Sequence, residues 1–510
     1  MAVVPKYETI KADDYKTLAP KQTAVECVLK SENGSVISKV LSITCDTSLL
    51  SVESVSGEAR YSGRVDFKAL YEDDNGEVNT IAYYADFNDK IEDGCITPVS
   101  QLYCVLNITD NQTSSVSKDE IKLVCVLEAV IKVNNIAQIP VLSEGEGFLC
   151  NQSSANISNF SGGGKDVCEV SDEFEEKAVI KKMLLSDASV IVSNVIAGVD
   201  TITVEGEAVA KLTYLSEDEK RVIDSIVRIL PFKHEIDAKE VLPSDRAFAE
   251  CVIKTLKVNA VVDEEKNITA IKLSLDIEIM ARAYSSTCIN YVDDVFSPDC
   301  KLNMTFTGIN SRIFISSFNY KEIIEGVANL DDDMMVAENI LSATGSRIHI
   351  ANIISEEGAI TIEGIAVTTV LYGGTVEDVT KIASVNVEIP FSKKMEMAGA
   401  RQGDSINMSA AIFDVEAKCH KGKEIDVKIL VKIRADLFTD DVITVLSDIE
   451  VTDAEVNPQS SISIYCPSEN ERLWDIAKQL GVSPETIMTY NPDIKFPASG
   501  SRIFIYRQKF

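Results

Sequence analysis

The sequence predicts a mainly β protein, with three β-sandwich or barrel-like repeat domains followed by a small strand–helix–helix–strand module. Two observations carry this prediction. A glycine followed eight residues later by a tyrosine, within an alternating apolar pattern, occurs three times, and no long amphipathic helix lies between the copies. The last fifty residues instead carry helix start and stop signals between two short isoleucine-rich segments.

The repeated segment is predicted to form one long strand in each copy. Its glycine and tyrosine are Gly63 and Tyr71, Gly206 and Tyr214, and Gly364 and Tyr372. Residues two apart in a strand share a face, so the even offset places each pair on one face. In the second copy that face is otherwise apolar: Ile202, Val204, Ala208, Ala210 and Leu212. A glycine inside such a strand indicates a bend, a bulge or a close backbone approach.

The copies remain similar downstream of the tyrosine. Pro231-Phe232 matches Pro390-Phe391, and Phe87 stands at about the same place in the first copy. Proline there indicates an edge strand or a strand end. Each copy then closes on an alternating strand, over 121–133, 271–279 and 425–433. Strands with turn signals and no long helix favour a sandwich of roughly a hundred residues.

Composition between the copies predicts two linkers. Asn151 to Asp172 is rich in Ser, Asn and Gly and is predicted to be flexible; the second segment holds Asp331 to Asp333 and a short strand-like Ile313 to Ile315. The expected organisation is a first β-domain with an N-terminal extension (1–140), a linker (141–174), a second β-domain (175–292), a linker (293–334), a third β-domain (335–450) and the terminal module (460–510).

Local signals define the terminal module. An apolar stripe at i, i+3, i+4 and i+7 predicts a first helix, formed by Leu473, Ile476, Ala477 and Leu480. Gly481 is expected to end it. Ser483 and Pro484 predict the start of a second helix, and Asn491 before Pro492 its end. The flanking Ile462, Ile464, Ile503 and Ile505 suit two short paired strands.

These residues resemble the LysM module, in which a groove between loops binds N-acetylglucosamine polymers. LysM modules usually carry Gly-Asp-Thr where this chain has Asn470, Glu471 and Arg472. The charged loop favours a protein partner over a neutral glycan. Trp474, the only tryptophan, is either a sugar platform or a packing residue, and packing is favoured. The candidate partner- or glycan-binding residues are Asn470, Glu471, Arg472, Trp474, Asp475, Asn491, Pro492, Asp493 and Ile494.

The charge balance excludes several function classes. The formal net charge is −31, so nonspecific binding to nucleic acid or to an anionic membrane is disfavoured by repulsion. No run of about eighteen apolar residues exists, so no transmembrane segment is predicted. The first twenty residues lack an apolar signal-peptide region, and we expect the protein to stay in the compartment where it is made.

No catalytic chemistry is predicted. The three histidines have no recognisable partners, the twelve cysteines form no Cys-x-x-Cys pair, and the Asp331 to Asp333 run lacks calcium-loop spacing. Gly162 to Lys165 lacks the spacing of a phosphate-binding loop. The expectation is a non-enzymatic protein with no catalytic residue, cofactor or metal.

Three β-repeats ahead of a LysM-like module resemble the spore-coat SPOCS family (DUF3794 repeats). This resemblance implies a structural adaptor of the bacterial spore coat. It further implies that the LysM module docks the coat morphogenetic ATPase of the stage IV sporulation protein A type, in the mother-cell cytoplasm and then in the coat at the forespore surface. The alternative is a peptidoglycan- or N-acetylglucosamine-polymer-binding protein of the cell wall or spore cortex.

Overall fold

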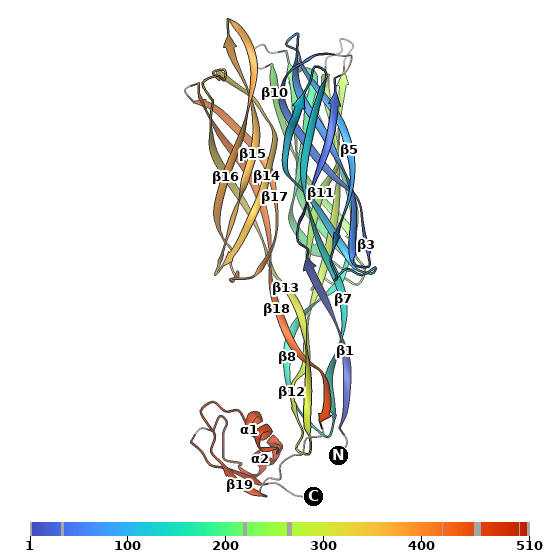
Figure 1. Cartoon of the computed structure of the whole chain (residues 1–510), viewed down its shortest axis with the longest axis vertical. Helices are drawn as coiled ribbons and strands as arrows, with labels where there is room; N and C mark the ends of the chain where they lie inside the picture. Colours follow the sequence, from blue (N-terminus) through green and yellow to red (C-terminus); the bar gives the residue numbers. More distant parts are fainter. Residues whose placement is uncertain are drawn as a thin grey trace.

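The computed structural model describes residues 3–31, 35–217, 222–262, 268–420, 422–452, 461–498 and 500–506. The molecule is elongated: three lobes of long strands lie at one end, a stalk of paired strands continues below them, and a small module lies at the foot (Figure 1). The predicted mainly β class is confirmed, since strands form most of the described chain.

The first lobe is a sandwich of two antiparallel sheets. One sheet has the order β3-β4-β5; in the other, β7 pairs with β1, β2 and β6. Its strands are β1 (Val4–Thr17), β2 (Lys21–Lys30), β3 (Ile37–Val55), β4 (Glu58–Asp73), β5 (Val78–Glu92), β6 (Gln101–Val116) and β7 (Glu120–Glu146).

The other two lobes repeat this arrangement. The third lobe holds the sheets β14-β15-β16 and β13-β18-β17, whereas in the second lobe β8 passes from one sheet to the other and gives the order β10-β9-β8-β12-β11. The second lobe contains β8 (Leu149–Ala197), β9 (Thr201–Ser216), β10 (Ile223–Asp237), β11 (Arg246–Val262) and β12 (Ile268–Phe296). The third contains β13 (Lys301–Asn329), β14 (Asn339–Glu356), β15 (Ala359–Val376), β16 (Val379–Glu396), β17 (Ser405–His420) and β18 (Glu424–Thr452).

The repeated glycine marks the same feature in every lobe. Gly206 lies opposite Phe232 on the next strand, and a Cβ added to it would lie 2.5 Å from Phe232 Cζ and 2.5 Å from the Ile191 carbonyl oxygen. Gly63 faces Phe87 and Gly364 faces Phe391 in the same way. The preceding strand has a β-bulge at each place, after Leu49, Val192 and Ile350. The predicted close approach is therefore confirmed, because the ring covers a backbone that has no side chain of its own.

The predicted core faces of the strands are also confirmed. Alternate residues of the closing strand β18 are buried from Ile425 to Ile433, and those of β12 from Ile271 to Ile279. Along β9 the even-numbered positions from Ile202 to Tyr214 face the core of the second lobe. A period of two with one buried face is what a sandwich strand requires.

The stalk corrects the prediction of flexible linkers. Residues 151–172 lie within β8 and pair with β12. β13 covers most of the second predicted linker, 293–334, and pairs with β18. Together with the lower parts of β1 and β7, these strands enclose a shared apolar core, formed by Ala12, Val141, Ile157, Ile309, Ile443 and Val445. The outward faces of the stalk strands are polar, which is why their composition resembles that of a linker.

The glycine run in β8 has a steric cause and does not indicate flexibility. A Cβ on Gly162 would lie 2.3 Å from the Lys239 carbonyl oxygen, and one on Gly164 would lie 2.6 Å from that of Asp237. The turn after β10 crosses β8 at this point, so only glycine fits. β7, β8 and β12 run without interruption through the expected boundaries at 140/141, 174/175 and 292/293. The division into separate domains stays a prediction.

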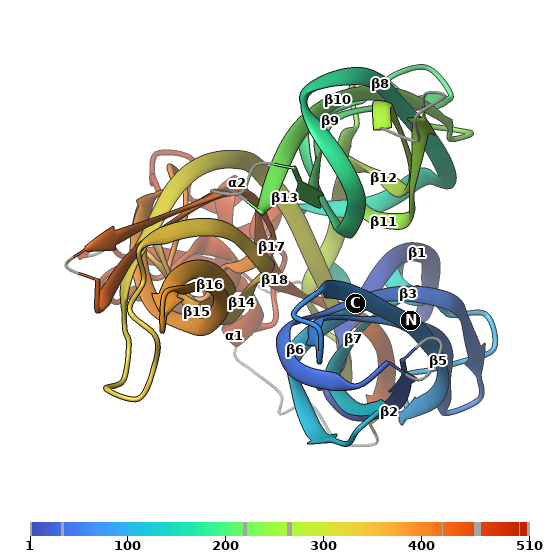
Figure 2. The same ribbon diagram turned by 90° about the horizontal axis from the view of Figure 1, so that it is seen from above.

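The three lobes contact one another around a common centre (Figure 2). Buried leucines from all three meet there, namely Leu41, Leu70, Leu184, Leu185, Leu341 and Leu371. Ser42 and Thr344 form a buried hydrogen bond of 2.7 Å between the first and third lobes, and Lys132 lies 2.8 Å from Glu250 between the first and second. The lobes therefore form one body rather than separate units.

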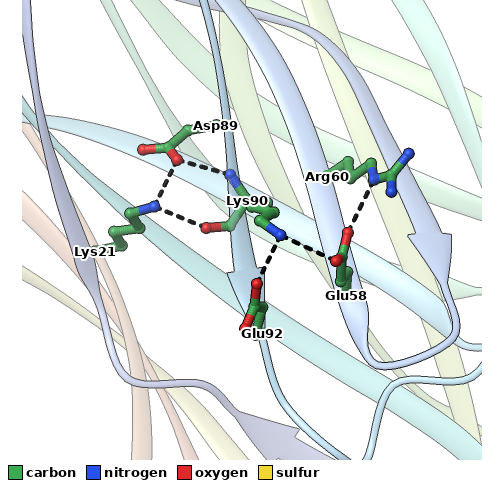
Figure 3. A network of polar contacts seen from close by, with 6 residues as sticks. All are labelled: Lys21, Glu58, Arg60, Asp89, Lys90 and Glu92. Carbon is green, nitrogen blue, oxygen red and sulfur yellow. Dashed lines mark hydrogen bonds and ion pairs between the residues drawn. The ribbon is translucent and has the colours of Figure 1, made fainter.

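A surface network ties the two sheets of the first lobe together (Figure 3). Lys21 of β2 donates to Asp89 and to the Lys90 carbonyl of β5, while Lys90 pairs with Glu58 at 3.0 Å. Arg60 and Glu92 extend it. Side-chain exposure in the network ranges from 19% at Asp89 to 67% at Glu92, so solvent weakens its ion pairs and their contribution to stability is small.

Candidate functional site

The terminal module has the predicted order of elements: β19 (Ile462–Tyr465), α1 (Leu473–Leu480), α2 (Pro484–Tyr490) and β20 (Ile503–Tyr506). The two strands pair antiparallel. Gly481 ends α1 at φ +63°, and the Ser483 hydroxyl accepts a hydrogen bond from the Thr486 amide at 3.1 Å. Each of these local predictions is confirmed. Neither α1 nor α2, the helices found among the described residues, has the length and apolar character needed to cross a membrane.

The loop before α1 is held by its own acidic side chain. Glu471 accepts hydrogen bonds from the Tyr465 hydroxyl at 2.7 Å and from the Ser468 amide at 2.9 Å, and the first of these raises the pKa of Tyr465. Asn470 adopts φ +65°, a conformation that asparagine tolerates better than most residues and that suits the glycine usual in LysM modules. The Glu471 carboxylate therefore holds the conformation of this loop.

Arg472 and Asp475 form an exposed pair beside this loop. Two hydrogen bonds of 2.9 Å join the guanidinium to the carboxylate, and they hold the pKa of Asp475 below its ordinary value. The pair neutralises both charges locally and leaves them open to solvent. It remains available to a partner, unlike Glu471.

The second predicted loop also contains a structural residue. Asn491 is buried; its amide nitrogen donates to the Ile487 and Phe504 carbonyls at 2.8 and 2.7 Å, and its oxygen accepts from the Phe504 amide at 2.7 Å. Asn491 thus joins the end of α2 to β20. Pro492 and Asp493 are exposed, and Ile494 packs against the module core.

Trp474 contacts the stalk. Its indole nitrogen donates to Asp294 at 2.8 Å, and its ring meets Phe296 edge-on with centroids 5.1 Å apart. Lys478, one turn further along α1, forms an ion pair of 2.5 Å with the same carboxylate. Both Asp294 and Phe296 belong to the end of β12. Trp474 therefore has the packing role that was favoured, although its partners come from the stalk as well as from the module.

A β-bulge at the end of β12 supplies this contact. The register with β8 shifts between Val292 and Asp294. Asp293 accepts hydrogen bonds from Asn151 and Ser153 of β8, whereas Asp294 faces the module. A bulge interrupts the regular alternation of side chains along a strand and changes their direction locally. At this bulge the two adjacent carboxylates have separate partners.

The structure therefore divides the nine predicted site residues. Four of them maintain the module (Asn470, Glu471, Asn491 and Ile494), one contacts the stalk (Trp474), and four remain at the surface (Arg472, Asp475, Pro492 and Asp493). Sequence reasoning missed Asp294 and Phe296, because both lie in a segment predicted to be a linker and 180 and 178 positions from Trp474. Binding by the predicted residues stays a prediction.

An open groove of about 650 Å³ lies between the second and third lobes, and it too was missed. Ser193, Gly206 and Phe232 line one side, and Asn319 and Lys432 the other. The lysine pairs with Glu207, and the Asn319 amide donates to the Ser193 carbonyl at 2.9 Å. Because these contacts join residues of both lobes, the groove is part of the interface between the second and third lobes.

Chemistry-bearing groups are dispersed. His234 lies 2.8 Å from Asp166, which is exposed, and this contact lowers the pKa of the carboxyl. Gly162 to Lys165 lies inside β8 and does not precede a helix, as a phosphate-binding loop would. Across the described ranges, no cluster of three or more His, Cys, Asp or Glu side chains is arranged to hold a metal ion.

Comparison with known proteins identifies the repeats. The family model described as "SipL, SPOCS domain" matches residues 179–261 and 337–420. These ranges run from the second half of β8 through β11 and from β14 through β17, the same portion of the second and third lobes. No curated protein and no solved structure matches the chain.

The first lobe shares its strand order and its glycine–phenylalanine pair with the two matched lobes. SipL SPOCS domains are not a known enzyme family and are associated with sporulation. The second and third lobes therefore each contain a region similar to the SPOCS domain of SipL, which relates these parts of the chain to sporulation proteins.

Proposed function

We propose that this protein is a non-enzymatic adaptor of the bacterial spore coat, in which a LysM-type terminal module docks the coat morphogenetic ATPase of the stage IV sporulation protein A type. The protein would act in the mother-cell cytoplasm and then in the coat at the forespore surface. The two SPOCS matches support a role in sporulation, and the resemblance to LysM suggests the docking element.

One observation carries the adaptor role: three similar lobes are joined into a single elongated body with a separate small module at its foot (Figure 1). Such a body presents three related surfaces at fixed spacing, so weak contacts at several of them add up through effective concentration.

Several polar and aromatic groups of the module are already used in contacts within the protein, and this favours a protein over a glycan as its ligand. Glu471 and Asn491 already use their polar atoms within the module, and the Trp474 ring lies against Phe296. A glycan groove needs free hydrogen-bonding groups and an open aromatic face. The exposed Arg472–Asp475 pair instead suits the polar rim of a protein interface.

The proposal is tested by binding of the purified ATPase to the full chain and to a chain ending at residue 452, with matching melting profiles of the lobes as the folding control. We expect the full chain to be retained and the shortened chain to be lost. Equal retention of both would overturn the docking assignment, and no retention of either would overturn the adaptor role. Saturable binding of N-acetylglucosamine oligomers to the full chain would favour the glycan-binding alternative.

A further inference from the structure

The contact between the module and the stalk covers the face of α1 that carries Trp474. Trp474 and Lys478 project from α1 onto the foot of the stalk, where Asp294 accepts from both. Phe296, itself buried, belongs to the same apolar cluster as Ile476 and Ala477 of α1. The module core is thus completed by a residue of β12.

The polar contacts between the module and the stalk meet at one carboxylate, that of Asp294. Asp294 faces the Trp474 indole N–H and the Lys478 ammonium. The pKa of Arg472 is raised mainly by its pair with Asp475, and Asp293 and Asp294 add smaller contributions. Asp293 is engaged by Asn151 and Ser153, so it holds the bulge rather than the module. A single acidic side chain therefore carries the polar part of the contact.

The ion pair between the module and the stalk is partly exposed to solvent. Asp294 and Lys478 are both partly exposed, with 26% and 36% of their side-chain surface accessible, so solvent weakens the ion pair. The apolar part adds Phe296 and the partly buried Leu149. A standard protein interface, with about 20–30 residues on each side, involves more residues than these three of the stalk.

We propose that Asp294 latches the terminal module onto the foot of the stalk, so that a protein partner using the Trp474 face of α1 binds only after the latch opens. This inference rests on the proposed docking role of the module and adds its regulation. In the latched form the module has a fixed orientation, and in the open form Trp474, Lys478 and Arg472 become one accessible surface. The fraction of molecules in which the latch is open then sets the apparent affinity for the protein partner.

The single tryptophan makes the latch measurable in the intact chain without a partner. Asp294→Ala removes the acceptor for both contacts, and Lys478→Met opens the latch from the module side. In both variants we expect Trp474 emission to shift to longer wavelength and its quenching by acrylamide to increase. Glu485→Gln is the matched control, since it removes an exposed acidic charge from the same module on α2 and should leave both signals unchanged.

Folding is checked separately by the melting temperature and by hydrogen exchange at β20. If both latch variants remain folded and quench like Glu485→Gln, the latch does not exist in solution. If they open, binding of the purified ATPase to the full chain is compared next. When about a tenth of the wild-type chain is open, Asp294→Ala, which leaves the partner-binding face of α1 unchanged, raises the apparent affinity up to about tenfold.

The outcomes separate the latch from the proposed function. An open latch with unchanged ATPase affinity refutes the regulatory role while leaving the docking assignment in place. Increased quenching in variants that, like the wild type, bind no ATPase refutes the docking assignment and leaves only the intramolecular contact. Unchanged quenching with firm ATPase binding refutes the latch alone.

Discussion

A buried ion pair in the third lobe gives the sharpest stability prediction. Arg434 and Asp436 of β18 are 3% and 7% exposed. The guanidinium lies 2.9 and 3.1 Å from one carboxylate oxygen and donates to the Ser317 hydroxyl at 2.8 Å, and Ser317 in turn donates to Asp436. Arg434→Met keeps much of the side-chain volume but leaves the Asp436 carboxylate without its cation.

Removing one partner of such a pair costs about 3–5 kcal/mol, because the remaining charge stays desolvated. With about 2–4 °C lost per kcal/mol for a folding unit of 150–250 residues, the apparent Tm should fall by about 6 °C or more. Differential scanning calorimetry measures this. The double variant Arg434→Met with Asp436→Leu should recover most of the loss, since an apolar pair carries no desolvated charge.

An exposed pair in the same lobe serves as the control. Lys394 and Glu356 have 63% and 47% of their side chains accessible, so Lys394→Met should change the Tm by about 1 °C or less. If Arg434→Met behaves like Lys394→Met, the argument from desolvation is wrong. If the double variant is as unstable as Arg434→Met alone, the loss comes from packing rather than from the unpaired carboxylate.

Three further predictions concern single positions. Gly364→Ala should lower the Tm of the third lobe strongly, because its Cβ would lie 2.2 Å from the His349 carbonyl oxygen, whereas Gly94→Ala, with no atom within 4 Å, should leave the Tm nearly unchanged. Burial raises the pKa of Asp13 to about 6, so its contribution to the free energy of unfolding should fall by up to about 3 kcal/mol as the pH rises from about 4 through 6. Burial also raises the pKa of Asp187 to about 6, so urea titrations of Asp13→Asn should show a smaller fall than the wild type, and equal falls in the two proteins would contradict this assignment. Asn491→Ala removes three hydrogen bonds, so hydrogen exchange should quicken at β20 while the lobes stay protected; unchanged exchange there would show that Asn491 does not hold the strand.

The strand faces and helix ends could be predicted from the sequence because they depend on residues that are close together in the chain. A period of two along 201–216 and 424–433 requires one buried face, and the tyrosine eight residues after each glycine falls on that face whatever surrounds it. The caps of α1 and α2 are equally local, since Gly481 and the Ser483–Pro484 step act on backbone groups within one turn. These features depend on neighbours a few residues away.

The errors arose where burial depends on distant chain segments. Residues 151–172 and 301–329 have polar residues on one face and small or apolar residues on the other, a composition shared by linkers and by strands with one solvated face. Only pairing with β12 and β18, and the stalk core built from all three repeats, decides in favour of strands.

The sequence by itself determined the repeated sandwich strand, its glycine and aromatic residue, and the order of elements in the terminal module, because side-chain period, backbone conformation and capping are set within a few residues. Only the tertiary structure decided that the three repeats share a stalk and a leucine centre, and that Trp474 meets Asp294 and Phe296. Those contacts join residues more than a hundred positions apart, and their formation depends on the packing of whole sheets, which no local pattern encodes.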